Sequence, residues 1–322
     1  MTATLDVDSY LEFLSKEYLA DFVRHGGASV KFVVGSDPEV FDRFHGGLAE
    51  VAAANGYLYA RIDAAATKAH QIDQVFFALA RQADWEALAA RFVRSAYDDV
   101  SFPVPDRPGE LAVAAAAARH GVDRRELYRS VRRHLEAEVL GDHAMPHELR
   151  LGMLRLCQAQ LVAGDLDDTE RDAVLDWLRG DLRQIARLRS SLIYTRIARH
   201  NARHLLMSTG HWLVCTGHTG LVLDLDIGRL FVARRPPIEE REGLYYSKAM
   251  VLDAYEVLRQ LVDATDDLAS TLIAVSGPVE FLTDDVRGLP AYTALQLRVA
   301  DEVRDRRRAN PFGALVRLGA GP

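Results

Sequence analysis

Cysteine is almost absent from this sequence, since the 322 residues contain only Cys157 and Cys215. Two isolated thiols supply neither a disulfide framework nor the ligand spacing of a zinc finger, so we expect a reducing compartment. The first 18 residues are acidic and mixed, unlike a secretory leader, and no apolar run approaches the ~18 residues needed to cross a bilayer. These absences predict a cytoplasmic protein with no membrane partner.

An excess of positive charge is also lacking, because the net charge is −7. This balance excludes a chain that coats nucleic acid along its whole surface, although it allows a local basic face. The composition is 49% hydrophobic and 26% charged. Such a chain has enough apolar material for a sizeable core.

Short apolar runs alternate with amphipathic segments at both ends of the chain. Apolar runs predict strands at 28–34, 57–62, 220–227 and 268–275, and helical periodicity predicts helices at 11–24, 38–55, 246–261 and 291–308. A strand, a helix and a second strand within about 35 residues are typical of a parallel sheet. From 65 to 212 the pattern is helical almost throughout. The predicted fold class is therefore α/β, with a parallel sheet flanked by helices and a helical insertion.

The pattern divides the chain into three parts. Residues 1–100 would form the N-terminal part of the α/β core, and residues 101–190 a helical insertion that begins at a proline-rich break, FPVPDRPG. Residues 191–322 would complete the core with the third and fourth strands and the C-terminal helices.

The turn after the first strand stands where a phosphate-binding P-loop would lie. That motif, G-x-x-x-x-G-K-[ST], needs its lysine for the outer phosphates and its hydroxyl for magnesium. Here Gly35 is in place and Ser36 follows it, but Phe41 takes the lysine position and Asp42 the hydroxyl position. Two acids in the turn oppose a triphosphate, and Pro38 lacks an amide donor. From the turn alone, an ordinary strand-to-helix connection is the preferred interpretation.

The strand LVLDLDI, at 221–227, has the form of a Walker B strand, an apolar run that ends in a magnesium-binding acid. Either Asp224 or Asp226 fits that position, and Asp226, at the end of the strand, is preferred. Ile227 stands where a catalytic glutamate usually follows. An aspartate that only caps the next turn is the structural alternative.

Several segments together resemble the ATP-binding proteins of bacteriophage exclusion (BREX) loci. The similar segments are SVKFVVG (29–35), YLYARIDA (57–64), QVFFALARQADW (74–85), HNARHLLMSTGHWL (200–213), GLVLDLDI (220–227), LYYSKAMVLDAYEVLRQLVDATDD (244–267), LIAVSGPVEFLTDDVRGLPAYTALQLRV (272–299) and RDRRRANP (304–311). The resemblance runs through most of the chain and depends on no single short motif.

The resemblance implies an AAA-like P-loop NTPase fold with a nucleotide site. It would place Gly35 at the first P-loop glycine, with Ser36 beside it, and Asp226 at the Walker B aspartate. It would also place Ser276 at a polar sensor position, and Arg287 and Arg298 as arginines that reach a neighbour's nucleotide. The lysine and the serine or threonine that the family uses are missing, so the motif is degenerate. We therefore expect weak or no binding of ATP and magnesium, and the sequence does not establish an ATPase.

A second feature is an arginine-rich helical hairpin at 111–135. An alanine-rich helix meets a turn at His120-Gly121-Val122, and a second helix starts after Asp123. The second helix carries a cluster of arginines suited to nucleic-acid phosphates, namely Arg124, Arg125, Arg129, Arg132 and Arg133. A solvated hairpin with surface ion pairs is the alternative.

The histidine pair with helical i,i+4 spacing, His200 and His204, could present two imidazoles to a metal. It lacks a glutamate or cysteine partner, and the flanking Arg199 and Arg203 oppose a cation, so no metal is expected there. Three functions remain for the chain. It is either a pseudo-ATPase that serves as a scaffold or regulator of a phage-defence assembly, an active ATPase with an atypical loop, or a DNA-binding regulatory module. The expected partners are an ATPase or helicase with intact motifs, or further copies of the chain.

Overall fold

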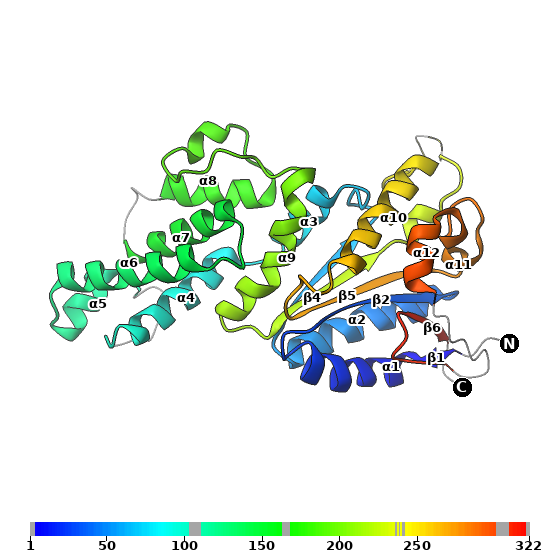
Figure 1. Cartoon of the computed structure of the whole chain (residues 1–322), viewed down its shortest axis with the longest axis horizontal. Coiled ribbons are helices and arrows are strands. Elements are labelled where there is room, and N and C mark those ends of the chain that lie inside the picture. Colours follow the sequence, from blue (N-terminus) through cyan, green and yellow to red (C-terminus); the bar gives the residue numbers. More distant parts are fainter. Residues whose placement is uncertain are drawn as a thin grey trace. The chain divides into compact units, whose positions relative to one another are not determined.

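The computed structural model describes residues 4–102, 111–162, 168–235, 237, 239, 242–300 and 309–319. These residues form two compact units, one made of Met1–Leu79 with His218–Pro322 and the other of Ala80–Gly217. The first is an α/β unit and the second is helical (Figure 1). The helical unit is longer at both ends than the 101–190 insertion predicted from the sequence, because the helices at 85–99 and 199–215 also belong to it.

The α/β unit has a six-stranded sheet in which every described pair of neighbouring strands is parallel. Its strands are β1 (Leu5–Asp6), β2 (Ala28–Gly35), β3 (Tyr57–Asp63), β4 (Gly220–Asp226), β5 (Thr271–Pro278) and β6 (Leu315–Gly319), in the spatial order β1-β6-β2-β5-β4-β3. This confirms the predicted fold class. The first two predicted strands, β2 and β3, are not neighbours, because β5 and β4 lie between them.

Helices cover both faces of the sheet, which explains why its central strands are continuous apolar runs. On one side lie α1 (Val7–Phe13), a π-helix (Leu14–Phe22) and α2 (Pro38–Ala54), and on the other lie α10 (Lys248–Asp263) and α12 (Thr293–Val299) (Figure 1). Val33 packs with the α1 and α2 layer, whereas the preceding residue, Phe32, stacks on Phe281 with ring centroids 5.7 Å apart. The predicted helix at 291–308 is described only as far as residue 300, so its remainder lies outside the described residues.

Shorter elements complete the α/β unit. They are α3 (Ile72–Ala80), which ends at the boundary between the units, α11 (Glu280–Thr283) and the 3₁₀ helices Gly228–Phe231 and Leu289–Ala291. No described helix is long and apolar enough to span a membrane.

The helical unit is a bundle with buried tryptophans. Its helices are α4 (Trp85–Asp99), α5 (Val113–His120), α6 (Arg124–Gly141), α7 (His147–Leu161), α8 (Asp168–Arg179), α9 (Arg199–Cys215) and a 3₁₀ helix, Ile185–Leu188. The predicted hairpin is formed by α5 and α6. Gly121 ends α5 in the left-handed region, with φ of 66°, and Asp123 caps α6 by accepting from the Glu126 amide at 2.8 Å.

Candidate functional site

A cavity of about 320 Å³ lies at the carboxyl ends of the central strands. Gly35 from β2, Asp226 from β4 and Gly277 from β5 line it. After β2 the chain crosses to β3 on one side, and after β5 it returns to β6 on the other. The crevice at such a topological switch point is where open α/β sheets bind ligands. The candidate site therefore lies at the turn where the family resemblance implies a nucleotide site.

The turn after β2 is too short to be a phosphate cradle. β2 ends at Gly35 and α2 begins at Pro38, so only Ser36 and Asp37 separate the strand from the helix. The motif needs four residues between its two glycines, whose amides surround the phosphates. Here the amide of Glu39 is taken by the Asp37 carboxylate at 2.9 Å, which caps the helix and places a negative charge at its first turn. The turn between β2 and α2 therefore has neither the phosphate cradle nor the lysine of a P-loop.

The side of α2 that follows the turn presents aromatic rings to the cavity. Phe41 and His45 are four residues apart on α2, and their ring centroids lie 6.3 Å from each other. The Phe41 ring also comes so close to Gly35 that a Cβ there would lie 3.4 Å from it. Phe41 therefore fills space next to the turn and offers no donor to a phosphate.

His45 is the centre of a buried polar cluster beneath this cavity. The side chain is 3% exposed, and its Nδ1 lies 2.6 Å from Asp224 Oδ2. Because a carboxylate only accepts, Nδ1 carries the proton and donates it. On the other side of the ring, Nε2 lies 3.4 Å from Ser276 Oγ and 3.7 Å from Asp226 Oδ2. One imidazole therefore links both acids of the Walker B-like strand to the predicted sensor serine.

Asp224 is fully buried, and its Oδ2 accepts hydrogen bonds from two donors. Besides His45, the Tyr59 hydroxyl donates to Asp224 Oδ2 at 2.6 Å. Burial raises the pKa of the Tyr59 hydroxyl, and the neighbouring Asp224 carboxylate raises it further. The second oxygen, Asp224 Oδ1, has no hydrogen-bond partner among the described residues. The carboxylate is thus held by this chain's own donors.

Asp226, the preferred Walker B aspartate, is at the surface of the cluster with its side chain 26% exposed. Its Oδ1 accepts from the Gly228 amide at 2.9 Å, and its Oδ2 lies 3.4 Å from Arg61 Nη2. With His45 on its third side, the carboxylate faces two cation-forming groups of the protein. A magnesium ion at this acid would compete with both.

The two arginines expected to reach a neighbour's nucleotide, Arg287 and Arg298, both contact groups of their own chain. Arg287 is 5% exposed, and its guanidinium donates to the carbonyl oxygens of Leu230, Tyr246 and Ala233 at 2.8–3.4 Å. This is the geometry of an arginine that fixes loops of its own chain. It does not fit an arginine that reaches a neighbouring subunit.

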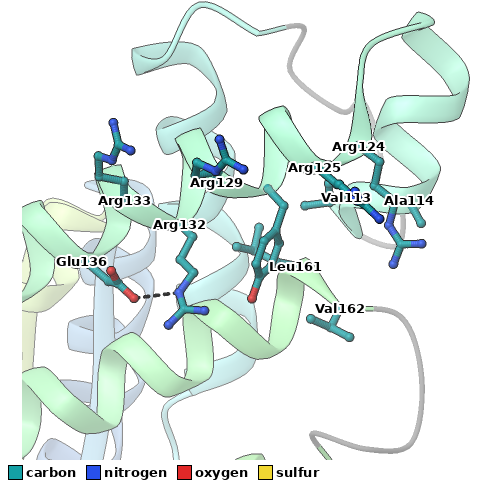
Figure 2. A pocket seen from close by; sticks show the side chains of 11 residues that line it. Val113, Ala114, Arg124, Arg125, Arg129, Arg132, Arg133, Glu136, Leu161 and Val162 are labelled. Atoms are coloured by element: carbon teal, nitrogen blue, oxygen red, sulfur yellow. Dashed lines mark hydrogen bonds and ion pairs between the residues drawn. The ribbon is translucent and has the colours of Figure 1, made fainter.

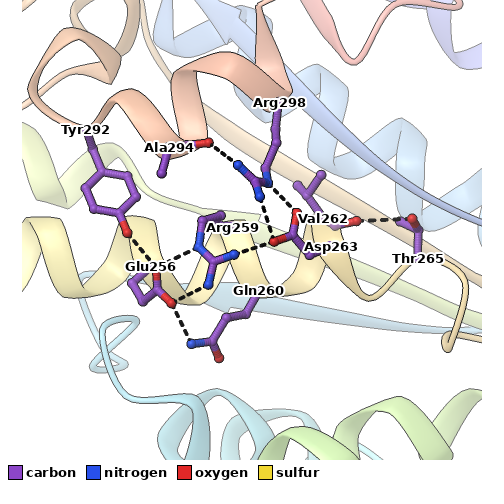
Figure 3. Close-up of polar contacts among 9 residues, drawn as sticks. All are labelled: Glu256, Arg259, Gln260, Val262, Asp263, Thr265, Tyr292, Ala294 and Arg298. Carbon is purple, nitrogen blue, oxygen red and sulfur yellow. Dashed lines mark hydrogen bonds and ion pairs between the residues drawn. The ribbon is translucent and has the colours of Figure 1, made fainter.

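Arg298 lies on α12 and is tied to α10 (Figure 3). Its Nη2 donates to Asp263 Oδ2 at 3.0 Å, and its Nε contacts Asp263 Oδ1. The Arg298 guanidinium is the main cause that lowers the pKa of Asp263. Next to it, Arg259 holds the pKa of Glu256 down to about 2, assisted by the Tyr292 hydroxyl. These charged residues join α10 to α12, and the side chains of Arg259 and Arg298 already have acidic partners.

The arginines of α6 border a groove of about 770 Å³ in the helical unit (Figure 2). All five predicted residues, Arg124, Arg125, Arg129, Arg132 and Arg133, are exposed and line it. Arg132 donates to Glu136 at 2.7 Å. In the described part of the chain, the other four have no acidic oxygen within 4.0 Å. Leu161 and Val162 at the end of α7 also line the groove and give it an apolar part.

Sequence reasoning missed His45 and Tyr59, which complete the cluster. A signal for His45 was present, because it follows Phe41 by four residues and thus shares the helix face of the lysine position. No comparable signal marked Tyr59, whose partner Asp224 is 165 residues away in the sequence.

Comparison with curated proteins found no match, and comparison with solved structures found none. The family described as BREX system ATP-binding protein BrxC/D matches residues 110–320, more than half of the chain. The match includes β4, α10, β5 and β6 and begins after β2 and its turn. The similarity expected for 29–35, 57–64 and 74–85 therefore stays a prediction. On the matched residues, the chain belongs to the family of BREX system ATP-binding proteins BrxC/D.

Proposed function

We propose that this protein is a pseudo-ATPase of a BREX phage-defence assembly, a scaffold or regulatory subunit that works beside a partner with an intact P-loop. The observation that supports it most directly is the contact of His45 with Asp224 and Asp226 in place of a metal site. Membership of a family named for ATP binding supports a nucleotide-related ancestry of the cavity. The cavity lies where a P-loop would lie and lacks the lysine and the hydroxyl of that motif.

The groups that the turn lacks contribute enough transition-state stabilisation to separate an active ATPase from an inactive protein. Removing a single preorganised donor from a transition-state site costs on the order of 10²–10³ in rate. Here the lysine, the hydroxyl and the loop amides are all replaced, and Asp37 adds a negative charge at the helix terminus. The cavity would therefore bind ATP weakly or not at all, and it would not hydrolyse ATP at a useful rate.

We expect no saturable binding of Mg-ATP below about 1 mM, which corresponds to about −4 kcal/mol of binding free energy. Titration calorimetry measures the binding, and phosphate release measures turnover. Asp226→Ala is the matched control, and it should behave as the wild type in both assays. Micromolar, magnesium-dependent binding with steady turnover that Asp226→Ala abolishes would instead favour an active ATPase with an atypical loop.

A second candidate function is DNA contact through the groove at α6. It is favoured by the four exposed arginines without an acidic partner among the described residues, on a helix that follows a short turn. Arginines of this kind bind phosphates and set the salt dependence of affinity. The partner would be duplex DNA, recognised through its backbone.

Neutralising Arg125, Arg129 and Arg133 together to Gln should weaken duplex binding at low salt at least tenfold. If each contacts one phosphate, the slope of log affinity against log salt should fall by about 3. Fluorescence anisotropy over a salt series measures both. The control is Arg183→Gln, Arg189→Gln and Arg199→Gln, which removes the same charge from exposed sites of the same unit. Equal losses in the two triple variants would reject a specific groove.

A further inference from the structure

Three side chains of types that ligate metals meet in the helical unit, and none of them lines either site described above. They are Asp142 at the end of α6, and His211 and Cys215 on α9. The ligand atoms of all three lie within 4.8 Å of one another. Nothing in the proposed pseudo-ATPase function uses them.

The local structure holds these side chains in position. His211 and Cys215 are four residues apart on α9, so the imidazole and the thiol lie on one face of the helix. Asp142 Oδ1 accepts from the Ala144 amide at 3.1 Å, which leaves Oδ2 to face His211. Ser208, on the same helix, donates to the Ala144 carbonyl at 3.1 Å and so ties the loop that carries Asp142 to α9.

The geometry distinguishes a metal site from a catalytic triad. In a Cys-His-Asp triad, the thiol faces one ring nitrogen and the carboxylate holds the other. Here both face the same nitrogen, since His211 Nε2 lies 2.6 Å from Asp142 Oδ2 and 3.5 Å from Cys215 Sγ. Three donor atoms gathered within 4.8 Å of one another fit a shared cation and do not fit a relay of protons.

The distances also fit a particular coordination. With Zn–S of about 2.3 Å and Zn–N of about 2.0 Å at tetrahedral angles, sulfur and nitrogen lie about 3.5 Å apart. That equals the spacing of Cys215 Sγ and His211 Nε2. The carboxylate would have to move back by roughly 0.7 Å, since oxygen and nitrogen on one zinc are about 3.3 Å apart. Rotation of the Asp142 side chain, which is 22% exposed, allows this.

We propose that Asp142, His211 and Cys215 bind a zinc ion. A thiolate, an imidazole and a carboxylate are the donor set of zinc rather than of magnesium or calcium, which prefer oxygen alone. Three protein ligands leave a fourth position to water, which reaches the site because all three residues are partly exposed. The ion would fasten the end of the arginine-bearing helix α6 to α9 in the helical unit.

The test uses cobalt as a spectroscopic substitute for zinc in the purified full-length chain. We expect one equivalent of Co²⁺ to produce a thiolate-to-cobalt charge-transfer band, and one equivalent of Zn²⁺ to remove it. Cys215→Ser should abolish the band, and His211→Gln should weaken binding at least tenfold. Cys157→Ser is the matched control, because burial raises the pKa of that fully buried thiol and keeps it from binding metal.

A readout without cobalt separates loss of binding from loss of folding. Zn²⁺ should slow maleimide modification of Cys215 at least tenfold in the folded wild type, and should not do so in His211→Gln, whose circular dichroism shows whether it is folded. The proposal is overturned if Cys215→Ser binds Co²⁺ as tightly as the wild type. It is equally overturned if the wild type shows neither the band nor protection at 100 μM metal.

Discussion

Asp224→Ala should lower the free energy of unfolding of the α/β unit by about 3 kcal/mol, the largest effect we expect from a single substitution at the site. The change leaves two buried donors, His45 Nδ1 and the Tyr59 hydroxyl, without their shared acceptor. Each buried group that loses its partner costs about 1–3 kcal/mol.

The tryptophans allow the loss to be assigned to one unit. All three, Trp85, Trp177 and Trp212, lie in the helical unit. Urea unfolding followed by tryptophan fluorescence therefore reports that unit, and far-ultraviolet circular dichroism reports both. We expect Asp224→Ala to move the dichroism transition to lower urea and to leave the fluorescence transition near its wild-type midpoint.

Two matched variants test the physical reason. Asp224→Asn keeps one oxygen acceptor in the same shape and should lose less than half as much stability. Asp226→Asn changes the partly exposed acid two residues later and should stay within about 1 kcal/mol of the wild type. If Asp224→Ala is no worse than Asp226→Asn, the buried cluster does not stabilise the fold.

The sheet was largely predictable because its strands are buried on both faces and therefore read as apolar runs. β2, β3, β4 and β5 were all predicted within three residues of their observed bounds. β6 was missed because only alternate residues of Leu315–Gly319 are buried, so the run is short and interrupted by Arg317. β1, at Leu5–Asp6, is too short to leave any pattern.

The location of the site was predictable from the sequence, but the contacts among the residues that form it were not. The start of α2 at Pro38 was expected from the sequence, yet it is incompatible with a P-loop that runs to Val40, and this conflict already signals a short turn. The pairing of His45 with Asp224 joins residues 179 positions apart. It depends on the strand order, which local patterns do not specify. The zinc group was missed for a similar reason, because Asp142 lies 69 residues before His211.

Raising the pH from 7 to 10 should stabilise the wild type relative to Lys31→Met by about 2.5 kcal/mol. Lys31 lies within β2 at 2% exposure, and its Nζ donates to the Tyr18 hydroxyl at 2.6 Å and to the Phe312 carbonyl at 2.7 Å. Burial lowers the pKa of Lys31 to about 8, and no acidic side chain among the described residues pairs with it.

The sign of this effect follows from where the proton is bound. Below pH 8 Lys31 is charged in both states, and the folded state carries the full cost of burying that charge. Between pH 8 and 10.5 the unfolded chain binds the proton and the folded chain releases it, so stability rises with pH. Urea unfolding at several pH values measures the difference between wild type and variant. Lys248→Met, at an exposed position of α10, removes the same charge, and its difference from the wild type should stay constant. A constant difference for Lys31→Met as well would mean that Lys31 keeps its proton in the folded protein up to pH 10, held by its oxygen acceptors despite its burial.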